Sequence, residues 1–167
     1  MKQKAISFII IILLLFAAAG CSKSPITSQD TNRSLVDMAG RAVIIPEKIE
    51  KVYCTTPRGT IFIYSLAPDK LVGWNIKRTE AEKEYIPLKY RELPVLGGWY
   101  GENNTGNMEE VLKINPDVII SVDDLNSSMA VSNAEKIQNQ LGIPVVIIDG
   151  NINETAAAYQ FAGELLG

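Results

Sequence analysis

Apolar residues along the chain follow two alternating patterns, which together predict strands that alternate with helices. Short apolar runs are typical of buried strands in parallel sheets, and three of them lie at 51–54, 117–120 and 142–149. Before the last run, apolar residues three or four positions apart predict one buried helix face: Ala130, Ala134, Ile137 and Leu141. The pattern therefore predicts a layered α/β domain.

Further elements are predicted from turn and breaker residues in the first half of the folded part, which we expect to begin at Leu35. Residues 36–46 predict a small hairpin that turns at Ala39 and Gly40 and ends at Pro46. Threonines and a proline in 55–60 predict the start of a helix, because these residues suit a helix cap and first turn. Residues 71–74 predict a further strand. The charged residues 79–91 predict a short helix and a loop.

The second half carries clear helix boundaries. Asn107 can cap a helix whose third residue is Glu110, and the Asn115-Pro116 pair ends that helix. Ser132 and Glu135 predict a capping box, and a last helix is expected from Asn153 to the end of the chain.

Strands that alternate with helices predict a Rossmann-like, doubly wound and mainly parallel sheet. In such sheets ligands bind beyond the carboxyl ends of the strands. Here those ends are expected to carry the following residues: 54–59, 74–75, 98–100 and 121–124.

The N-terminus indicates export. Two lysines precede twelve apolar residues at 8–19, and small residues then precede Cys21. This order predicts a lipoprotein signal peptide at 1–20, with Cys21 as the lipidated first residue, although Ala18 stands where such sequences usually have leucine. A plain signal peptide and an uncleaved anchor are the alternatives. Residues 21–34 then predict a flexible tether, so the protein is expected outside the cytoplasm, anchored by lipid to a bacterial membrane.

Composition excludes several functions. The chain has no histidine, a net charge of −3 and no cluster of basic residues. Histidine-dependent catalysis and the usual histidine-rich metal sites are therefore excluded, and nucleic-acid binding has no support. Neither a glycine-rich phosphate loop nor a nucleophile elbow is present, so we expect a binding protein without a cofactor rather than an enzyme. With Cys21 lipidated, Cys54 has no disulfide partner and is expected to be a buried thiol.

Candidate ligand contacts lie at the predicted strand ends. Arg58 could pair with a carboxylate, a phosphate or an anionic chelate, or could be a solvated arginine at a helix start. Three aromatic residues could cover a large flat ligand: Trp74, Trp99 and Tyr100. Packing in the core is the alternative for all three, above all for Trp74. Weaker candidates at the rim are Asn75, Ser121 and Asp123.

Several motifs resemble, in order and spacing, the substrate-binding proteins of iron–siderophore and cobalamin ABC importers. They are VDMAGR at 36–41, IP at 45–46, APDKLVG at 67–73, NME at 107–109, KINPDVII at 113–120 and LGIPV at 141–145. The resemblance covers residues 36–167. It implies two α/β lobes joined by a long helix, with the ligand held between them. Residues 35–167 would be the N-terminal lobe, and we expect this lobe alone to bind its ligand weakly or not at all.

The resemblance also implies partners. Glu109 matches an acid that docks on arginines of the ABC permease, which works with an ATPase; alternatively it complements the dipole of its helix. The expected ligand is an iron–siderophore, haem or corrinoid chelate. A small oxyanion such as molybdate is the alternative, because Thr55, Thr56, Thr60 and Ser121 could donate hydrogen bonds. A surface receptor that senses a ligand without transporting it is a further alternative.

Overall fold

The computed structural model describes residues 31–100 and 104–167. The predicted signal peptide, the lipidation site Cys21 and the tether as far as residue 30 lie outside the described residues. Strand β1 begins at Asn32, so residues 32–34 belong to a strand and not to the tether predicted for 21–34. No helix in the described ranges combines the length and the apolar character needed to cross a membrane.

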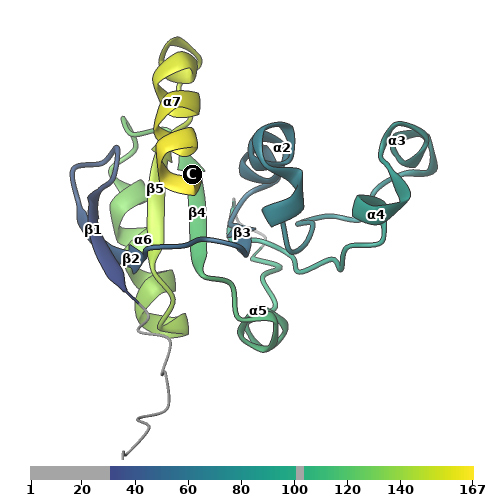
Figure 1. The fold of residues 1–167 in the computed structure, drawn as a ribbon, viewed down its shortest axis with the longest axis horizontal. Coiled ribbons are helices and arrows are strands. Elements are labelled where there is room, and N and C mark those ends of the chain that lie inside the picture. The colour runs from purple at the N-terminus through teal and green to yellow at the C-terminus, as the bar shows by residue number, and fades with distance from the viewer. Residues whose placement is uncertain (1–30, 101–103) are drawn as a thin grey trace, which may run out of the picture.

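A parallel sheet of three strands forms the centre of the molecule (Figure 1). Its strands, in spatial order, are β3 (Val52–Cys54), β4 (Val118–Asp123) and β5 (Val145–Asp149). The three predicted apolar runs supply these strands, and almost every residue in them is buried because both faces of the sheet are covered. The predicted parallel sheet is confirmed.

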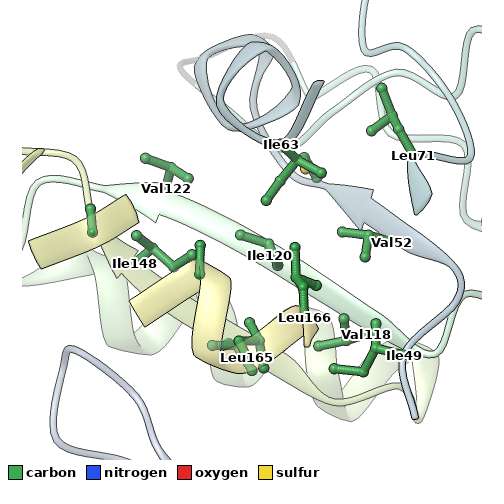
Figure 2. Packing of buried hydrophobic residues seen from close by; sticks show 14 of the residues in the cluster. Ile49, Val52, Ile63, Leu71, Val118, Ile120, Val122, Ile148, Leu165 and Leu166 are labelled. Atoms are coloured by element: carbon green, nitrogen blue, oxygen red, sulfur yellow. The ribbon is translucent and has the colours of Figure 1, made fainter. Parts of the chain in front are cut away.

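Helices cover both faces, as expected for a doubly wound fold. One face packs against α2 (Pro57–Leu66) and α7 (Thr155–Leu166), where Ile63 and Leu165 are buried against strand residues such as Ile120 (Figure 2). The other face packs against α5 (Met108–Ile114) and α6 (Met129–Leu141). The predicted face of α6 is confirmed, because the four residues predicted to form it are the buried residues of the helix.

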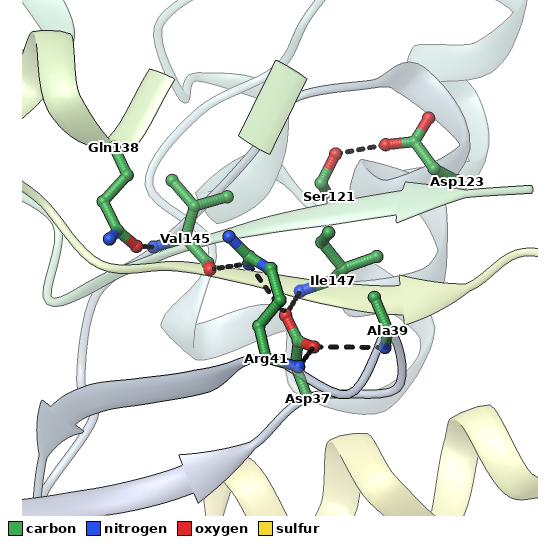
Figure 3. A network of polar contacts seen from close by, with 8 residues as sticks. All are labelled: Asp37, Ala39, Arg41, Ser121, Asp123, Gln138, Val145 and Ile147. Atoms are coloured by element: carbon green, nitrogen blue, oxygen red, sulfur yellow. Dashed lines mark hydrogen bonds and ion pairs between the residues drawn. The ribbon is translucent and has the colours of Figure 1, made fainter. Parts of the chain in front are cut away.

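A hairpin with the predicted turn closes the outer side of β5, but its first strand lies at 32–36, before most of the predicted range 36–46. Strands β1 (Asn32–Val36) and β2 (Ala42–Pro46) pair antiparallel, and their connecting turn lies against β5. In that turn the buried carboxylate of Asp37 accepts the main-chain N–H of Ile147 at 3.2 Å (Figure 3). Arg41 pairs with Asp37 and donates to the carbonyl of Val145 at 2.6 Å. The turn thus occupies hydrogen-bonding groups that an edge strand would otherwise expose.

The segment predicted as a strand at 71–74 is not a regular strand. It follows the 3-10 turn Pro68–Lys70 and pairs through two isolated bridges, one from Leu71 to Val52 and one from Trp74 to Val95. The partners differ, so no continuous ladder forms. The charged segment that follows contains two short helices, α3 (Glu80–Tyr85) and α4 (Leu88–Arg91), where a short helix and a loop were predicted.

Helix boundaries agree with the sequence in part. Asn107 caps α5 by accepting the N–H of Glu110 at 3.2 Å, as predicted. The capping box at Ser132 is wrong, because α6 begins earlier, at Met129, and Ser132 lies inside it. The last helix also begins later than Asn153, because a 3-10 turn, Ile152–Glu154, precedes α7.

Candidate functional site

The carboxyl ends of the three parallel strands meet along one border of the sheet. We call this border the carboxyl edge. We define it by the last residues of β4 and β5, the residues that follow the three strands, and the loop beside them: 55–59, 97–100, 121–124 and 149–151. Helix α2 begins here, with Thr56 as its cap: the Thr56 hydroxyl accepts the N–H of Gly59 at 3.0 Å. A doubly wound sheet places its binding groups at this border.

Arg58 lies across the carboxyl edge. Its guanidinium donates to the carbonyl of Gly150 at 3.3 Å and to the carbonyl of Val122 at 3.2 Å, so it joins the ends of β4 and β5. A Cβ atom on Gly150 would lie 2.8 Å from the guanidinium carbon, so a larger residue there would displace the end of the Arg58 side chain. No carboxylate in the described part of the chain forms an ion pair with Arg58. The side chain is therefore oriented while its charge stays available to an anion.

Ser121 lies below the surface of this edge. It is 3% exposed, and its hydroxyl lies 2.9 Å from the hydroxyl of Thr55. The Ser121 hydroxyl also donates to the carboxylate of Asp123, which is partly exposed. Ser121 and Thr55 therefore satisfy each other inside the protein, and Asp123 is the member of this group that reaches the surface.

Trp74 and Asn75, predicted as ligand contacts, are both buried. Trp74 is 1% exposed, donates its indole N–H to the carbonyl of Tyr90 at 2.8 Å, and has the guanidinium of Arg78 4.9 Å from its ring centre. Asn75 is 3% exposed, and its amide nitrogen donates to the carbonyls of Cys54 and Gly97, each at 2.7 Å. Asn75 thus fixes the loop at 97 to the end of β3, and neither side chain presents a surface to a ligand.

Trp99 and Tyr100 lie on the loop beside the carboxyl edge. The main-chain N–H of Trp99 donates to the carbonyl of Thr55 at 2.9 Å. The indole ring of Trp99 lies edge-on to the ring of Tyr53, with ring centres 5.8 Å apart. A Cβ atom on Gly106 would lie 2.5 Å from this indole, so the ring packs closely over the glycine. Both aromatic residues are partly exposed and border a hollow of about 220 Å³ next to α6.

The three predicted aromatic contacts do not form one surface. Trp74 belongs to the core on the α2 and α7 side of the sheet, whereas Trp99 packs against the core on the α5 and α6 side. Arg58 and Trp99 also border different hollows. The structure therefore keeps Arg58, Trp99 and Tyr100 accessible at the carboxyl edge but does not gather them around one cavity.

The buried titratable groups near the edge are unsuited to catalysis. Cys54 is fully buried, and burial raises the pKa of its thiol, so the reactive thiolate is disfavoured. Burial likewise raises the pKa of Tyr53, whose hydroxyl donates to the carbonyl of Gly97 at 2.7 Å. Among the described residues no group of three or more histidine, cysteine, aspartate or glutamate side chains could hold a metal ion.

Glu109 is exposed in the first turn of α5. Its neighbours Met108 and Leu112, which are 39% and 46% exposed, add apolar surface to the same helix. Glu110 supplies a main-chain N–H to the cap, and its carboxylate lies 3.9 Å from the ammonium group of Lys113.

The third strand, β5, also contributes residues to the carboxyl edge, which was not predicted from the sequence. Asp149 ends β5 and residues 150–151 follow it, and the carbonyl of Gly150 accepts a hydrogen bond from Arg58. The signal was present, because the apolar run 145–148 ends in the turn-forming residues Asp149, Gly150 and Asn151.

The fold is similar to that of solved solute-binding proteins. An ABC transporter solute-binding protein from Sulfurospirillum deleyianum matches with 26% identity and a TM-score of 0.68, over 80% of this chain and 42% of that one. A periplasmic solute-binding protein from Veillonella parvula matches with 25% identity and a TM-score of 0.57, over 81% and 41%. The molybdate periplasmic binding protein of Haemophilus influenzae, at 24% identity and a TM-score of 0.52 over 74% and 37%, shows likeness of fold alone.

No protein-family model matches the sequence, and no curated protein matches it. The chain spans well under half the length of the solved proteins it resembles. These proteins have two lobes. The described chain has the α/β fold of one lobe of the ABC transporter solute-binding proteins.

Proposed function

We propose that this chain is a ligand-binding lobe of an extracytoplasmic solute-binding protein that serves an ABC importer. It would capture a metal chelate (an iron–siderophore, haem or corrinoid complex) and deliver it to the permease and its ATPase, without catalysing a reaction. The observation that carries the proposal is the fold likeness to ABC transporter solute-binding proteins, together with an oriented arginine at the carboxyl edge.

The chemistry of the edge favours a chelate over a small oxyanion. A small oxyanion would need several convergent N–H and hydroxyl donors. The hydroxyls of Thr55 and Ser121 are buried and hydrogen-bonded to each other, and the hydroxyl of Thr60 donates to the buried Asn75. By contrast, Arg58, Trp99 and Tyr100 keep exposed surface, which suits a larger ligand with anionic and flat parts.

The membrane and permease contacts form the second part of the proposal. Cys21 would carry the lipid that holds the protein at the outer surface of the membrane. Glu109 would dock on arginines of the permease, since it is exposed in the first turn of α5 and has exposed apolar neighbours. Glu109→Arg should then reduce uptake of the ligand by cells without changing the affinity of the protein for it. The control is Glu92→Arg, because Glu92 is an exposed acid that follows α4, and this substitution should leave uptake unchanged.

NMR spectroscopy tests ligand binding most directly, because it detects weak as well as tight complexes. The ¹⁵N-labelled chain would be titrated with gallium(III) siderophores, cobalamin, gallium protoporphyrin and molybdate, gallium replacing iron to avoid paramagnetic broadening. Saturable shifts of amides at 55–59, 97–100, 121–124 and 149–151 with one chelate would support the proposal. Arg58→Gln should weaken binding by roughly tenfold or more. Arg91→Gln, on α4, is the matched control.

Three results would count against parts of the proposal. Saturable shifts with molybdate alone would favour the oxyanion. A chelate that binds without being taken up by cells carrying the permease would favour a receptor. Shifts confined to residues outside the carboxyl edge would contradict the site.

A further inference from the structure

A hollow of about 240 Å³ lies beside the carboxyl edge, between the first turns of α2 and α7. Side chains from both helices and from the end of β4 surround it, among them Arg58, Ile61, Phe62, Val122, Thr155 and Tyr159. Val122 lies on the face of the sheet that packs against these two helices (Figure 2). The hollow is separate from the one beside Trp99 and Tyr100.

Most of the surface of this hollow is apolar, and part of it is uncovered. Ile61 is 49% exposed and Tyr159 is 37% exposed. The rings of Phe62 and Tyr159 have centres 4.3 Å apart, and the hydroxyl of Tyr159 lies 2.8 Å from that of Ser65. These contacts join α2 to α7 at one end of the hollow and fix the orientation of the two rings.

Arg58 supplies the positive charge of the hollow. Its guanidinium is held by two neutral carbonyl oxygens, those of Gly150 and Val122, and both contacts are longer than 3 Å. The acid that borders the hollow, Asp149, accepts the N–H of Asn151 at 2.9 Å and forms no ion pair with Arg58. A guanidinium has five donors in a fixed plane, so it can keep these two contacts and still bind a carboxylate.

We propose that this hollow binds an aromatic carboxylate, with the carboxylate on Arg58 and the ring against Ile61, Phe62 and Tyr159. The volume is smaller than the roughly 300–1,000 Å³ of pockets for drug-sized ligands, so it suits a single ring. This inference rests on the proposed function, because it assigns the hollow to one aromatic carboxylate arm of the captured ligand. It narrows the ligand to a chelating molecule that carries such an arm.

Titration of the ¹⁵N-labelled chain with benzoate and 2-hydroxybenzoate tests the site, with neutral benzamide as the control ligand. Saturable shifts of amides at 58–62, 149–151 and 155–159 are expected with both acids and not with benzamide. Ile61→Glu places a negative charge in the exposed lining and should abolish binding. Leu66→Glu is the control, because Leu66 is on the same helix, outside the hollow, and is 37% exposed. This variant should bind both acids as the unchanged chain does. Arg58→Gln should weaken binding at least about tenfold.

The possible outcomes separate this inference from the proposed function. Chelate binding at the carboxyl edge without any effect of benzoate or 2-hydroxybenzoate would overturn the inference and leave the proposed function standing. Benzoate binding without any detectable chelate binding would support the hollow as a carboxylate site without supporting the chelate role, since this lobe alone is expected to bind its ligand weakly or not at all. Equal loss of benzoate binding in Ile61→Glu and Leu66→Glu would also overturn the inference, because the effect would then be a general one of added charge.

Discussion

The buried carboxylate of Asp37 is expected to contribute more to stability than any surface ion pair among the described residues, and Asp37→Asn tests this without changing the side-chain volume. One oxygen of Asp37 accepts the N–H groups of Ala39 and Arg41, at 3.1 and 2.9 Å. The other accepts the N–H of Ile147 and two donors of the Arg41 guanidinium (Figure 3). An amide group would place its NH₂ against donors in either orientation.

The size of the expected loss of stability in Asp37→Asn follows from the burial of the two side chains. The Asp37 side chain is 0% exposed and that of Arg41 is 13% exposed, so neither the carboxylate nor the donors it leaves unpaired can turn freely to water. Removing one partner of a buried pair costs about 3–5 kcal/mol. A domain of this size has a free energy of unfolding of roughly 5–15 kcal/mol. We therefore expect Asp37→Asn to remove a large fraction of the total stability.

Urea unfolding at pH 7, followed by far-UV circular dichroism, measures the difference. Lys48→Ala is the matched control, because Lys48 and Glu50 form a pair at 2.7 Å whose side chains are 83% and 57% exposed. Such an exposed pair contributes little to stability, because water and salt screen its charges. Hydrogen exchange of the Ile147 amide should also become faster in Asp37→Asn. If Asp37→Asn and Lys48→Ala differ by less than about 1 kcal/mol, the argument from buried acceptors is refuted.

Three further predictions concern the edge and its helices. Because burial raises the pKa of Cys54, the folded chain keeps a proton that the unfolded chain loses, so the free energy of unfolding should fall above about pH 8.5 by about 1.4 kcal/mol per pH unit. Cys54→Ala should flatten that slope in urea unfolding at pH 7–10. Gly106→Ala should displace the indole of Trp99, shift its fluorescence emission and cost about 1–3 kcal/mol, whereas Gly163→Ala, with open space around it, should be neutral or stabilising. Asn107→Ala should cost about 1 kcal/mol in thermal unfolding, through loss of the cap, and no change would contradict the capping role.

The sequence was sufficient to predict the sheet and the buried face of α6, because apolar runs and helical spacing have direct structural meaning. It was insufficient for residues 71–74, where an apolar run predicted a strand. In the structure this segment instead forms single bridges to two different partners, Val52 and Val95. The early start of α6 was also missed. Ser128 precedes the helix at the cap position and is a residue type that suits a cap, but its side chain makes no cap hydrogen bond.

The candidate site was predicted less completely, because its residues depend on tertiary packing. Trp74 and Trp99 both follow apolar segments, and nothing local shows that one is 1% exposed while the other keeps exposed surface. Asn75 stands at a predicted strand end, yet its amide serves main-chain carbonyls from two other segments. The partners of Arg58 lie 64 and 92 residues away in sequence, at distances that no local pattern encodes.

Hydrogen bonds occupy both sides of the sheet, which agrees with the proposal that a ligand binds at its carboxyl edge. On the β5 side, the carbonyl of Val145 and the N–H of Ile147 are occupied by Arg41 and Asp37. On the β3 side, the carbonyl of Val52 accepts the N–H of Val72 at 3.0 Å. A partner cannot readily add a strand to either occupied stretch. The ends of the parallel strands carry instead an arginine whose two acceptors are neutral, and a guanidinium in that state gains free energy by binding an anion.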